Sequence, residues 1–410
     1  MGKPEIRFKG YTDEWEQRKL GDIADVTKLA GFEFTEHVVY SDEGNIIALR
    51  GLNIKNGQLI LDDVKYIDGS NFSKLSRSKL FINDIMFTYV GTVGEVAIIK
   101  ENDRFYLAPN VSRIRVKSDD SPKFISHYMR TDNFKNKVIF PLIATSSQPA
   151  LSMENIRKFT INIPINREEQ DCLAKYFDSL DHLITLHQRK CDEIKSLKKY
   201  MLQKMFPQNE QKVPEIRFKG FTEAWEQRKL NDISDVRDGT HDSPKYQNTG
   251  HPFVTSKNVK DGFINYDDIQ FISDEDFNEI NKRSKVDVND ILMGMIGTIG
   301  NMALIRTEPD FAIKNVALIK DTKQINYLYL YHFLHSPFIE KQLSSGMDGG
   351  TQKFVSLGNV RNLDIVYPSE VEQIKLGDYF EHLDHLITLH QQKCEELKKI
   401  KKFMLQKMFV

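Results

Sequence analysis

The feature that constrains this chain most is a long segment that occurs twice. Residues 176–206 and 379–409 align without a gap at an offset of 203 and are identical at 23 of 31 positions. A match of that length indicates an internal duplication. Each half of the chain is therefore expected to carry an equivalent copy of the same long element.

Each copy has the pattern of an amphipathic helix. Apolar or small residues alternate at spacings of four and three from Leu173 to Met205, and Lys198 is the one charged residue in this row. The second copy repeats the row from Leu376 to Met408. Such a row is typical of a coiled-coil seam.

Both helices also carry start signals. Asn166 with Glu169, and Ser369 with Glu372, have the spacing of an N-cap and its capping-box partner. About 39 helical residues would extend roughly 58 Å. A compact domain does not require a helix of that length for its own core, so we interpret both helices as spacers.

Charge is unevenly distributed along both helices. The formal net charge is −3 over 167–188 and +4 over 189–206, and it is −4 over 370–391 and +4 over 392–409. Antiparallel pairing places acidic beside basic halves and suits both helix dipoles. We therefore expect an intramolecular antiparallel coiled coil; the alternative is two solvated helices that never meet.

Composition narrows the class of protein. A length of 410 residues predicts more than one domain. The formal net charge of −1 means that any nucleic-acid surface must be local. Three cysteines fit a reduced protein without disulfides. We find neither a signal-peptide core nor an apolar run of membrane-spanning length, so we expect a cytoplasmic protein.

A second repeat precedes each variable region. Residues 4–26 and 214–236 agree at 18 of 23 positions and contain both tryptophans, Trp15 and Trp225, which we interpret as packing anchors. The predicted organisation is a globular domain followed by a long helix, twice over. The expected boundaries are a domain at 1–165, a helix at 166–206, a domain at 207–368 and a helix at 369–410.

The two variable regions diverge but keep short motifs in register. Gly91–Gly94 (GTVG) matches Gly297–Gly300 (GTIG), and Asn110-Val111 matches Asn315-Val316. Short β-branched runs interrupted by turn signals predict strands. The expected strands are 46–49, 85–90, 96–99, 112–116 and 160–163, and the expected helices are near 122–134 and 325–338. We therefore predict an α+β chain: two mixed α/β domains in tandem with two long helices, related by an approximate two-fold axis.

This duplicated order resembles the specificity subunit of a type I restriction–modification enzyme, over essentially the full length. The Gly-Thr-x-Gly loop carries the resemblance together with the Ser/Thr-Gln element before Asn-Ile/Val-Arg and the segments that begin the helices. These elements are 91–94 and 297–300, 147–148 with 155–157, 351–352 with 359–361, 168–170 and 371–373.

The resemblance implies a DNA-recognition function. Each domain would be a target-recognition domain that reads one half of a bipartite, asymmetric site in double-stranded DNA. The coiled coil would set the unread spacer, and two methyltransferase subunits would dock on the chain. Restriction or translocase subunits would then join. S-adenosylmethionine would be bound by the methyltransferases, ATP and Mg²⁺ by the restriction subunits, and no cofactor by this chain.

The residues themselves argue against catalysis. We find neither the Walker A pattern nor a glycine-rich cofactor loop nor an amino-methyltransferase motif. Pro309-Asp310 followed by Asp321 and Lys323 loosely resembles a nuclease signature, but the first domain lacks an equivalent. Two rival hypotheses remain: a two-headed structural adaptor that binds proteins, and a fused single-chain restriction enzyme.

Candidate DNA contacts are polar residues expected on exposed loops, because base readout and phosphate binding both require such side chains. The alternative for the glycine loops is a tight strand turn whose threonine is exposed by accident. The candidates are Arg50, Asn53, Lys55, Thr92, Arg113, Ser146, Ser147 and Gln148 in the first domain, and Thr240, His241, Lys245, Ser256, Lys257, Asn258, Lys260, Thr298, Gln352 and Lys353 in the second.

One further constellation lies in the helices. His187 and Cys191 are four residues apart near the middle of the first helix, and His390 and Cys394 match them in the second. Antiparallel pairing would bring the four into one layer, which could bind zinc tetrahedrally. The alternative is a polar layer that fixes the register of the coiled coil.

Overall fold

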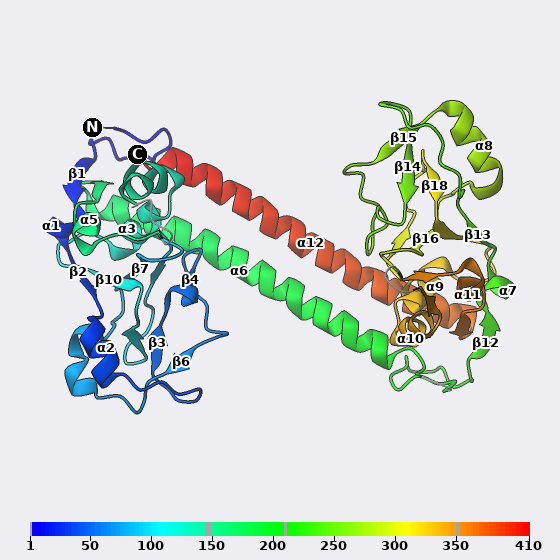
Figure 1. Cartoon of the computed structure of the whole chain (residues 1–410), viewed down its shortest axis with the longest axis horizontal. Coiled ribbons are helices and arrows are strands. Elements are labelled where there is room, and N and C mark those ends of the chain that lie inside the picture. The colour runs from blue at the N-terminus through cyan, green and yellow to red at the C-terminus, as the bar shows by residue number, and fades with distance from the viewer. Residues whose placement is uncertain (1, 144–148, 209–210, 350–352) are drawn as a thin grey trace. The chain divides into compact units, whose positions relative to one another are not determined.

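The computed structural model describes residues 2–143, 149–208, 211–349 and 353–410 (Figure 1). The chain divides into two compact units, Met1–His187 with Gln392–Val410, and Gln188–Gln391. Each unit therefore combines one globular domain with part of each long helix. Within the described ranges, none of the helices is apolar over enough of its length to cross a lipid bilayer.

The domain of the first unit contains two main sheets. The four-stranded sheet is antiparallel, and the three-stranded sheet pairs its central strand with one parallel and one antiparallel neighbour. In spatial order the strands are β2 (Ala24–Lys28), β10 (Val111–Val116), β7 (Ile85–Thr88) and β8 (Val96–Ile98), then β6 (Lys65–Tyr66), β3 (Ile47–Leu49) and β9 (Phe105–Leu107).

Shorter elements complete this domain. The helices are α1 (Leu20–Ile23), α2 (Gly31–His37), α3 (Pro122–Met129), α4 (Asp132–Phe134) and α5 (Met153–Arg157). Two small antiparallel pairs join β1 (Glu16–Lys19) to β11 (Thr160–Ile163) and β4 (Ile54–Lys55) to β5 (Gln58–Leu59).

The second domain repeats the same plan. Its four-stranded sheet is β13 (Val236–Asp238), β19 (Val316–Ile319), β16 (Ile291–Gly294) and β17 (Met302–Leu304), and its three-stranded sheet is β15 (Gln270–Ile272), β14 (His251–Thr255) and β18 (Ala312–Lys314). The small pairs are β12 (Glu226–Lys229) with β22 (Asp364–Tyr367), and β20 (Met347–Asp348) with β21 (Phe354–Val355). The helices are α7 (Leu230–Ile233), α8 (Asp274–Ser284), α9 (Tyr327–Leu334), α10 (Pro337–Ser345) and α11 (Leu357–Arg361).

Alternation along one central strand shows why these residues form a sheet with two covered faces. In β7, Ile85 and Phe87 pack into the core that contains Trp15, whereas Met86 packs into a second core with Leu49. Successive side chains of a strand point to opposite faces, so a strand buried on both sides is apolar throughout. The predicted strands and the two predicted helical segments are confirmed.

Each tryptophan is a packing anchor, as predicted. Trp15 and Trp225 are 1% and 2% exposed. The Trp15 ring lies 6.2 Å from Phe409, at the end of the second long helix, and Trp225 lies 6.4 Å from Phe206, at the end of the first. The repeated N-terminal segment and the repeated helix therefore share one core in each unit.

The two predicted long helices are α6 (Arg167–Lys204) and α12 (Glu370–Met408). They run antiparallel within both units. In the first unit, Lys401 of α12 pairs with Asp181 of α6; in the second, Lys198 of α6 lies 2.6 Å from Asp384 of α12. Lys198, the charged residue of the apolar row, is thus neutralised by the partner helix, and the alternative of unpaired helices is wrong.

The expected capping boxes are replaced by a different contact. The Glu169 carboxylate accepts hydrogen bonds from the Arg7 guanidinium, and the Glu372 carboxylate accepts them from Arg217. Asn166 does accept a hydrogen bond from the Glu168 amide at the start of α6. The two glutamates consequently fasten the N-terminal segment of each repeat to a helix.

Candidate nucleic-acid interface

Four loops of the second domain meet at one place. Thr298, between β16 and β17, donates its hydroxyl to the carbonyl of Ser256 at 2.6 Å. The Ser256 hydroxyl donates in turn to the carbonyl of Asn315, at 2.5 Å. Asn315 follows β18, and its amide side chain contacts His241, which follows β13, at 2.8 Å. The structure thus brings four separated polar segments together at one end of the sheets.

His241 is the most exposed part of this cluster. One ring nitrogen contacts Asn315 Oδ1 and the other contacts Asp238 Oδ2, both at 2.8 Å, while the side chain remains 66% exposed. Asp238 is buried and also pairs with Arg283. Two fixed oxygens therefore orient the imidazole and occupy both of its ring nitrogens, so the ring offers a base its exposed face and not a free nitrogen.

Several other predicted contact residues of the second domain, four lysines and a threonine, are accessible to solvent. Lys245, Lys257 and Lys353 are exposed, and Lys260 and Thr240 are half-buried. Exposed lysine ammonium groups on loops suit phosphate binding, because each is a compact positive charge on a flexible stem and can meet a phosphate in many geometries. Gln352 lies outside the described residues, as do Ser146, Ser147 and Gln148 of the first domain.

Asn53 and Asn258 are buried and act on their own loops. The Asn53 carbonyl oxygen accepts from the Arg50 amide at 3.0 Å, and its amide nitrogen donates to the Ile60 carbonyl at 2.9 Å. Asn258 makes the equivalent bonds to Thr255 and Asn265, at 3.0 and 3.1 Å. Both side chains therefore hold equivalent loops in one shape, and neighbouring residues are left to face outward.

In the first domain the predicted contacts divide into exposed and internal side chains. Lys55 and Thr92 are exposed. Arg50 is partly exposed and binds Asp63 at 2.8 Å. Arg113 is buried and binds Asp25 at 2.7 Å. Partial burial alone would raise the pKa of Asp25, but the Arg113 guanidinium outweighs it and lowers that pKa. Arg113 is thus engaged inside the domain.

The Gly-Thr-x-Gly loops are tight turns in both domains. Gly91, Gly94, Gly297 and Gly300 have φ values of 80°, 95°, 73° and 81°, in the left-handed region that favours glycine. The turn presents Thr92 to solvent, whereas it directs the Thr298 hydroxyl to Ser256. The glycines therefore have a structural explanation, and the two threonines differ in what they offer to a ligand.

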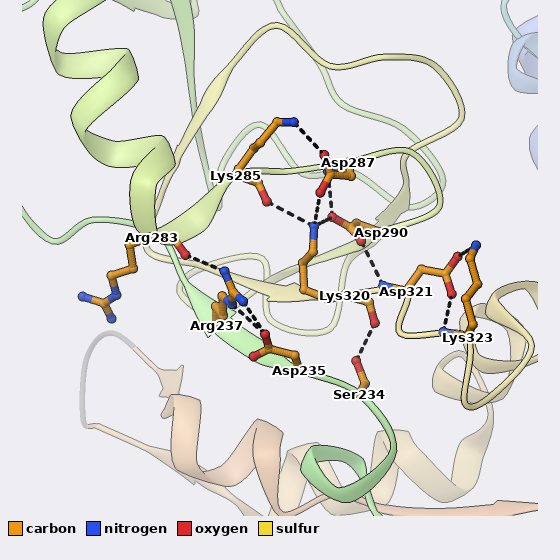
Figure 2. A network of polar contacts seen from close by, with 10 residues as sticks. All are labelled: Ser234, Asp235, Arg237, Arg283, Lys285, Asp287, Asp290, Lys320, Asp321 and Lys323. Atoms are coloured by element: carbon orange, nitrogen blue, oxygen red, sulfur yellow. Dashed lines mark hydrogen bonds and ion pairs between the residues drawn. The ribbon is translucent and has the colours of Figure 1, made fainter.

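A network of ion pairs supports the loops of the second domain (Figure 2). Lys320 Nζ lies 2.6 Å from both Asp287 and Asp290, and Arg237 Nε donates to Asp235 at 2.8 Å. Arg237 also donates to the Arg283 carbonyl, while the Arg283 side chain points away from it in the view. The cations of this network are already neutralised by acids, so we regard it as support for β13 and β19 and not as a phosphate-binding surface.

The loose nuclease pattern is divided between two different pairs. Asp310 lies 2.7 Å from His251, whereas Asp321 pairs with Lys323. Figure 2 shows Asp321 and Lys323 facing each other at the end of the network, where the Asp321 amide donates to Asp290. These carboxylates therefore serve separate contacts.

The sequence reasoning missed Asn315 and Asp238, which orient His241. The signal for Asn315 was present, since Asn110-Val111 and Asn315-Val316 occupy matching positions. Asn110 and Asn315 both have positive φ, at 71° and 52°. A left-handed asparagine after a strand indicates a turn whose amide can organise its neighbours.

The predicted zinc layer of His187, Cys191, His390 and Cys394 stays a prediction. Cys191 and Cys394 are buried. Within the first unit, the Cys394 thiol donates to the Ile184 carbonyl at 3.9 Å. That contact places the Cys394 thiol between α12 and α6 of the first unit.

Comparison with known proteins adds the family. The family model for the type I restriction modification DNA specificity domain matches residues 12–196 and again residues 222–399. The putative type I restriction enzyme MjaX specificity subunit of Methanocaldococcus jannaschii is 22% identical over 409 residues, which cover 95% of this chain and 91% of that protein. The MjaVIII specificity subunit of the same organism is 22% identical over 348 residues, covering 81% of this chain and 80% of that protein.

Solved structures agree on the fold. The crystal structure of the type I restriction–modification system S subunit from M. genitalium superposes with a TM-score of 0.62 at 15% identity and covers 100% of this chain and 99% of its own. A chain from a structural study of complex assembly and conformational transition of the type I R-M system gives a TM-score of 0.53 at 17% identity, covering 97% and 98%. With both halves of the sequence matched by the same family model, the chain belongs to the family of type I restriction modification DNA specificity domains.

Proposed function

We propose that this chain is the DNA sequence-recognition subunit of a type I restriction–modification complex, and that its two domains, residues 1–165 and 207–368, each read one half of a bipartite, asymmetric site. The supporting observation is one scaffold that carries different polar residues on matched loops. Asn53 and Asn258 hold equivalent loops, yet the residue whose amide each one binds is Arg50 in the first domain and Thr255 in the second.

The proposed contacts divide by chemistry. Lys55, Lys245, Lys257, Lys260 and Lys353 would anchor phosphates, because their ammonium groups lie on loops and are fully or partly exposed. Arg50, Thr92, Thr240 and His241 would meet bases, together with the predicted residues outside the described ranges. Asn53, Asn258, Ser256 and Arg113 would position these side chains, because they are buried and bind the protein. Thr298 would act in the same way, because it donates its hydroxyl to the Ser256 carbonyl.

The spacer between the half-sites would be set by the long helices. A helix of 38 residues, the length of α6, extends about 57 Å. At 3.4 Å per base pair this corresponds to at most roughly 17 base pairs. Inserting seven residues into both α6 and α12, in the same register, should lengthen the unread spacer by about three base pairs. A half-site spacing that does not change would contradict the proposed role of the helices.

Partner binding has its own support, a duplicated apolar surface. Leu186, Ile400 and Phe403 are exposed on the helices of the first unit, and Leu389, Leu197 and Tyr200 occupy the corresponding positions of the second. Large exposed apolar side chains that recur in two copies suit two copies of one partner. We propose that one methyltransferase subunit docks on each set. Restriction or translocase subunits would join the resulting assembly.

In this assignment the chain contributes recognition and assembly, without catalysis. S-adenosylmethionine would be bound by the methyltransferase subunits, and ATP and Mg²⁺ by the restriction subunits. The complex would act in the cytoplasm, where cellular DNA is accessible.

The direct test is genomic adenine methylation in cells that carry this chain with a cognate methyltransferase subunit. A new bipartite motif that disappears when this chain is omitted is expected, and replacing residues 27–165 with another domain should change one half of it. The adaptor hypothesis predicts no new motif, and binding to DNA without sequence dependence or a steep salt dependence. Methylation by the same methyltransferase with another specificity subunit is the positive control.

A further inference from the structure

The second unit contains a fully buried imidazole without a hydrogen-bond partner. His332, in α9, is 0% exposed, and neither of its ring nitrogens makes a hydrogen bond to any residue that the structure describes. Its Nε2 lies 3.8 Å from Glu381 Oε2, and its Nδ1 lies 3.9 Å from Asp384 Oδ2. Buried polar atoms are nearly always satisfied, so this histidine requires an explanation.

The surroundings of His332 have the composition of a metal site. One ligand atom each from His332, Glu381 and Asp384 lie within 4.8 Å of one another. Glu381 and Asp384 are three residues apart on α12, so both carboxylates face α9 from the same side of their helix. One imidazole with two carboxylates suits divalent first-row transition metals such as Zn²⁺.

Two cations already touch the carboxylates. Arg306 binds both oxygens of Glu381, at 2.6 and 2.8 Å, and Lys198 binds both oxygens of Asp384, at 2.6 and 2.7 Å. An ionised carboxylate has about four lone-pair sites, so one oxygen can bind a metal while the other keeps its cation. The Arg306 side chain is 48% exposed and is therefore free to withdraw towards solvent.

In the first unit, the corresponding junction is the contact of α3 with α6, and there the histidine is hydrogen-bonded. The matching histidine, His127, contacts Asp178 at 2.9 Å through Nε2 and Arg130 at 3.2 Å through Nδ1. Arg130 also binds Asp181 at 3.0 Å, where Lys401 binds as well. Both nitrogens of His127 are satisfied by the protein, and an arginine occupies the space beside the second carboxylate.

A single residue distinguishes the two junctions at that point. The position of Arg130 is taken by His335 in the second unit, and its Nε2 contacts Asp261, at 2.9 Å. His335 thus leaves His332 and Asp384 without the bridging guanidinium. The duplication has therefore produced one junction in which both nitrogens of the histidine are bonded, and one in which the carboxylates have cations but the histidine has no hydrogen bond among the described residues.

We propose that His332, Glu381 and Asp384 bind a divalent transition metal, with Zn²⁺ as the probe, and that the metal fastens α9 of the second domain to α12. The site would stabilise the attachment of the domain to the long helix, as the Arg130 contacts do in the first unit. The inference is independent of the proposed DNA recognition, because it concerns metal binding by the free chain.

The test uses the full-length chain purified without a histidine tag and freed of metal with a chelator. Titration with Zn²⁺, followed by calorimetry, should show one saturable site. The variants His332→Gln and Glu381→Gln should weaken binding by more than about 100-fold, since even the loss of a residue that only supports a ligand weakens binding by roughly 10- to 100-fold. His127→Gln, the matched change in the first unit, should bind Zn²⁺ like the unmodified chain.

Co²⁺ distinguishes this site from the predicted layer of histidines and cysteines. The site proposed here has no sulfur ligand, so its Co²⁺ spectrum should lack thiolate charge-transfer absorption, and Cys191→Ser/Cys394→Ser should retain the metal. Absence of saturable binding overturns the proposal. So does binding that survives in both His332→Gln and Glu381→Gln, or that is lost only in the cysteine variant. The use of two ligand variants provides a result if one fails to fold.

Discussion

The Arg7 guanidinium lies 2.6 Å from the Glu169 carboxylate, and Arg217 repeats this pair with Glu372 at 2.7 Å. Both glutamate side chains are 1% exposed, so each is a buried charge with one dedicated arginine. The pair links the N-terminal segment of each repeat to the start of a long helix. The two copies lie in different units, so the contribution of each ion pair to stability can be measured separately.

Replacing Glu372 with alanine should therefore destabilise the second unit while leaving the first unchanged. Removing one partner of a buried ion pair leaves the other charge unpaired and costs about 3–5 kcal/mol. Urea unfolding monitored by limited proteolysis in each domain would measure the effect. Glu169→Ala is the reciprocal variant, and equal destabilisation of both units by either change would contradict the prediction.

Substituting Lys257 with alanine should weaken DNA binding by the intact complex nearly uniformly across sequences. The expected mechanism is the loss of about one phosphate contact, which reduces the salt dependence of log K by about one. Lys285 is also exposed but is paired with Asp287, so Lys285→Ala is the matched control and should have no such effect. Binding assays at several salt concentrations would distinguish the two, and identical slopes would contradict the assignment of Lys257.

The buried His127 should make the first unit sensitive to mild acid. Burial lowers the pKa of His127 below its usual value, although the hydrogen bond to Asp178 opposes this. The unfolded chain then binds the proton first, so the free energy of unfolding falls as the pH drops below about 6.5, by at most about 1.4 kcal/mol per pH unit. His127→Gln should flatten this slope between about pH 7 and pH 5, measured by urea unfolding. A slope that His127→Gln leaves unchanged would contradict the prediction.

The lowered pKa of Asp178 predicts a second loss of stability, at lower pH, in the same part of the first unit. Burial alone would raise its pKa, but hydrogen bonds from His127 and Lys123 outweigh this and lower the pKa to about 2. A depressed carboxylate pKa stabilises the fold above the unfolded value near 3.8, and the stabilisation is lost as the pH falls towards 2. In Asp178→Asn the loss of stability between about pH 4 and pH 2 should be smaller. NMR titration of the carboxyl group would test the assignment directly.

Phe409 should be essential for the first domain although it follows the second long helix, far from that domain in the sequence. Its ring lies 5.4 Å from Phe124 and 5.3 Å from Phe177, inside the core that contains Trp15. Truncating a buried phenylalanine to alanine costs about 3–5 kcal/mol. Phe403→Ala, on the exposed side of the same helix, should leave the melting temperature of the free chain unchanged. If both variants melt alike, Phe409 does not support this core.

Much of the fold could be predicted because the same sequence pattern occurs in both halves of the chain. The apolar row from Leu173 to Met205 defined the long helix, and the opposed charges of its halves gave the antiparallel direction. Both follow from local spacing and simple electrostatics. The role of Glu169 could not be predicted in this way, because Arg7 lies far from it in the sequence and only the tertiary fold brings them together.

The same limit applies to the interface. Residue type identified Asn53 and Arg113 as candidate DNA contacts. In the structure both are buried: Asn53 hydrogen-bonds to its own loop, and Arg113 pairs with Asp25. Conversely, His241 was predicted, whereas the two oxygens that orient it, from Asp238 and Asn315, were not. Composition indicates which side chains are able to bind DNA, and only packing determines which remain free to do so.

The division of the chain into units also fixes an order of construction. The second unit consists of Gln188–Gln391, so all of its residues are synthesised before Gln392. The first unit needs Gln392–Val410, which supply Phe409 and Met408 to its core. The domain that is synthesised first is thus the one whose core is completed last, because Met408 and Phe409 are added after the whole second unit. A chain truncated between Gln392 and Met408 would keep every residue of the second unit and lose Phe409 from the core of the first.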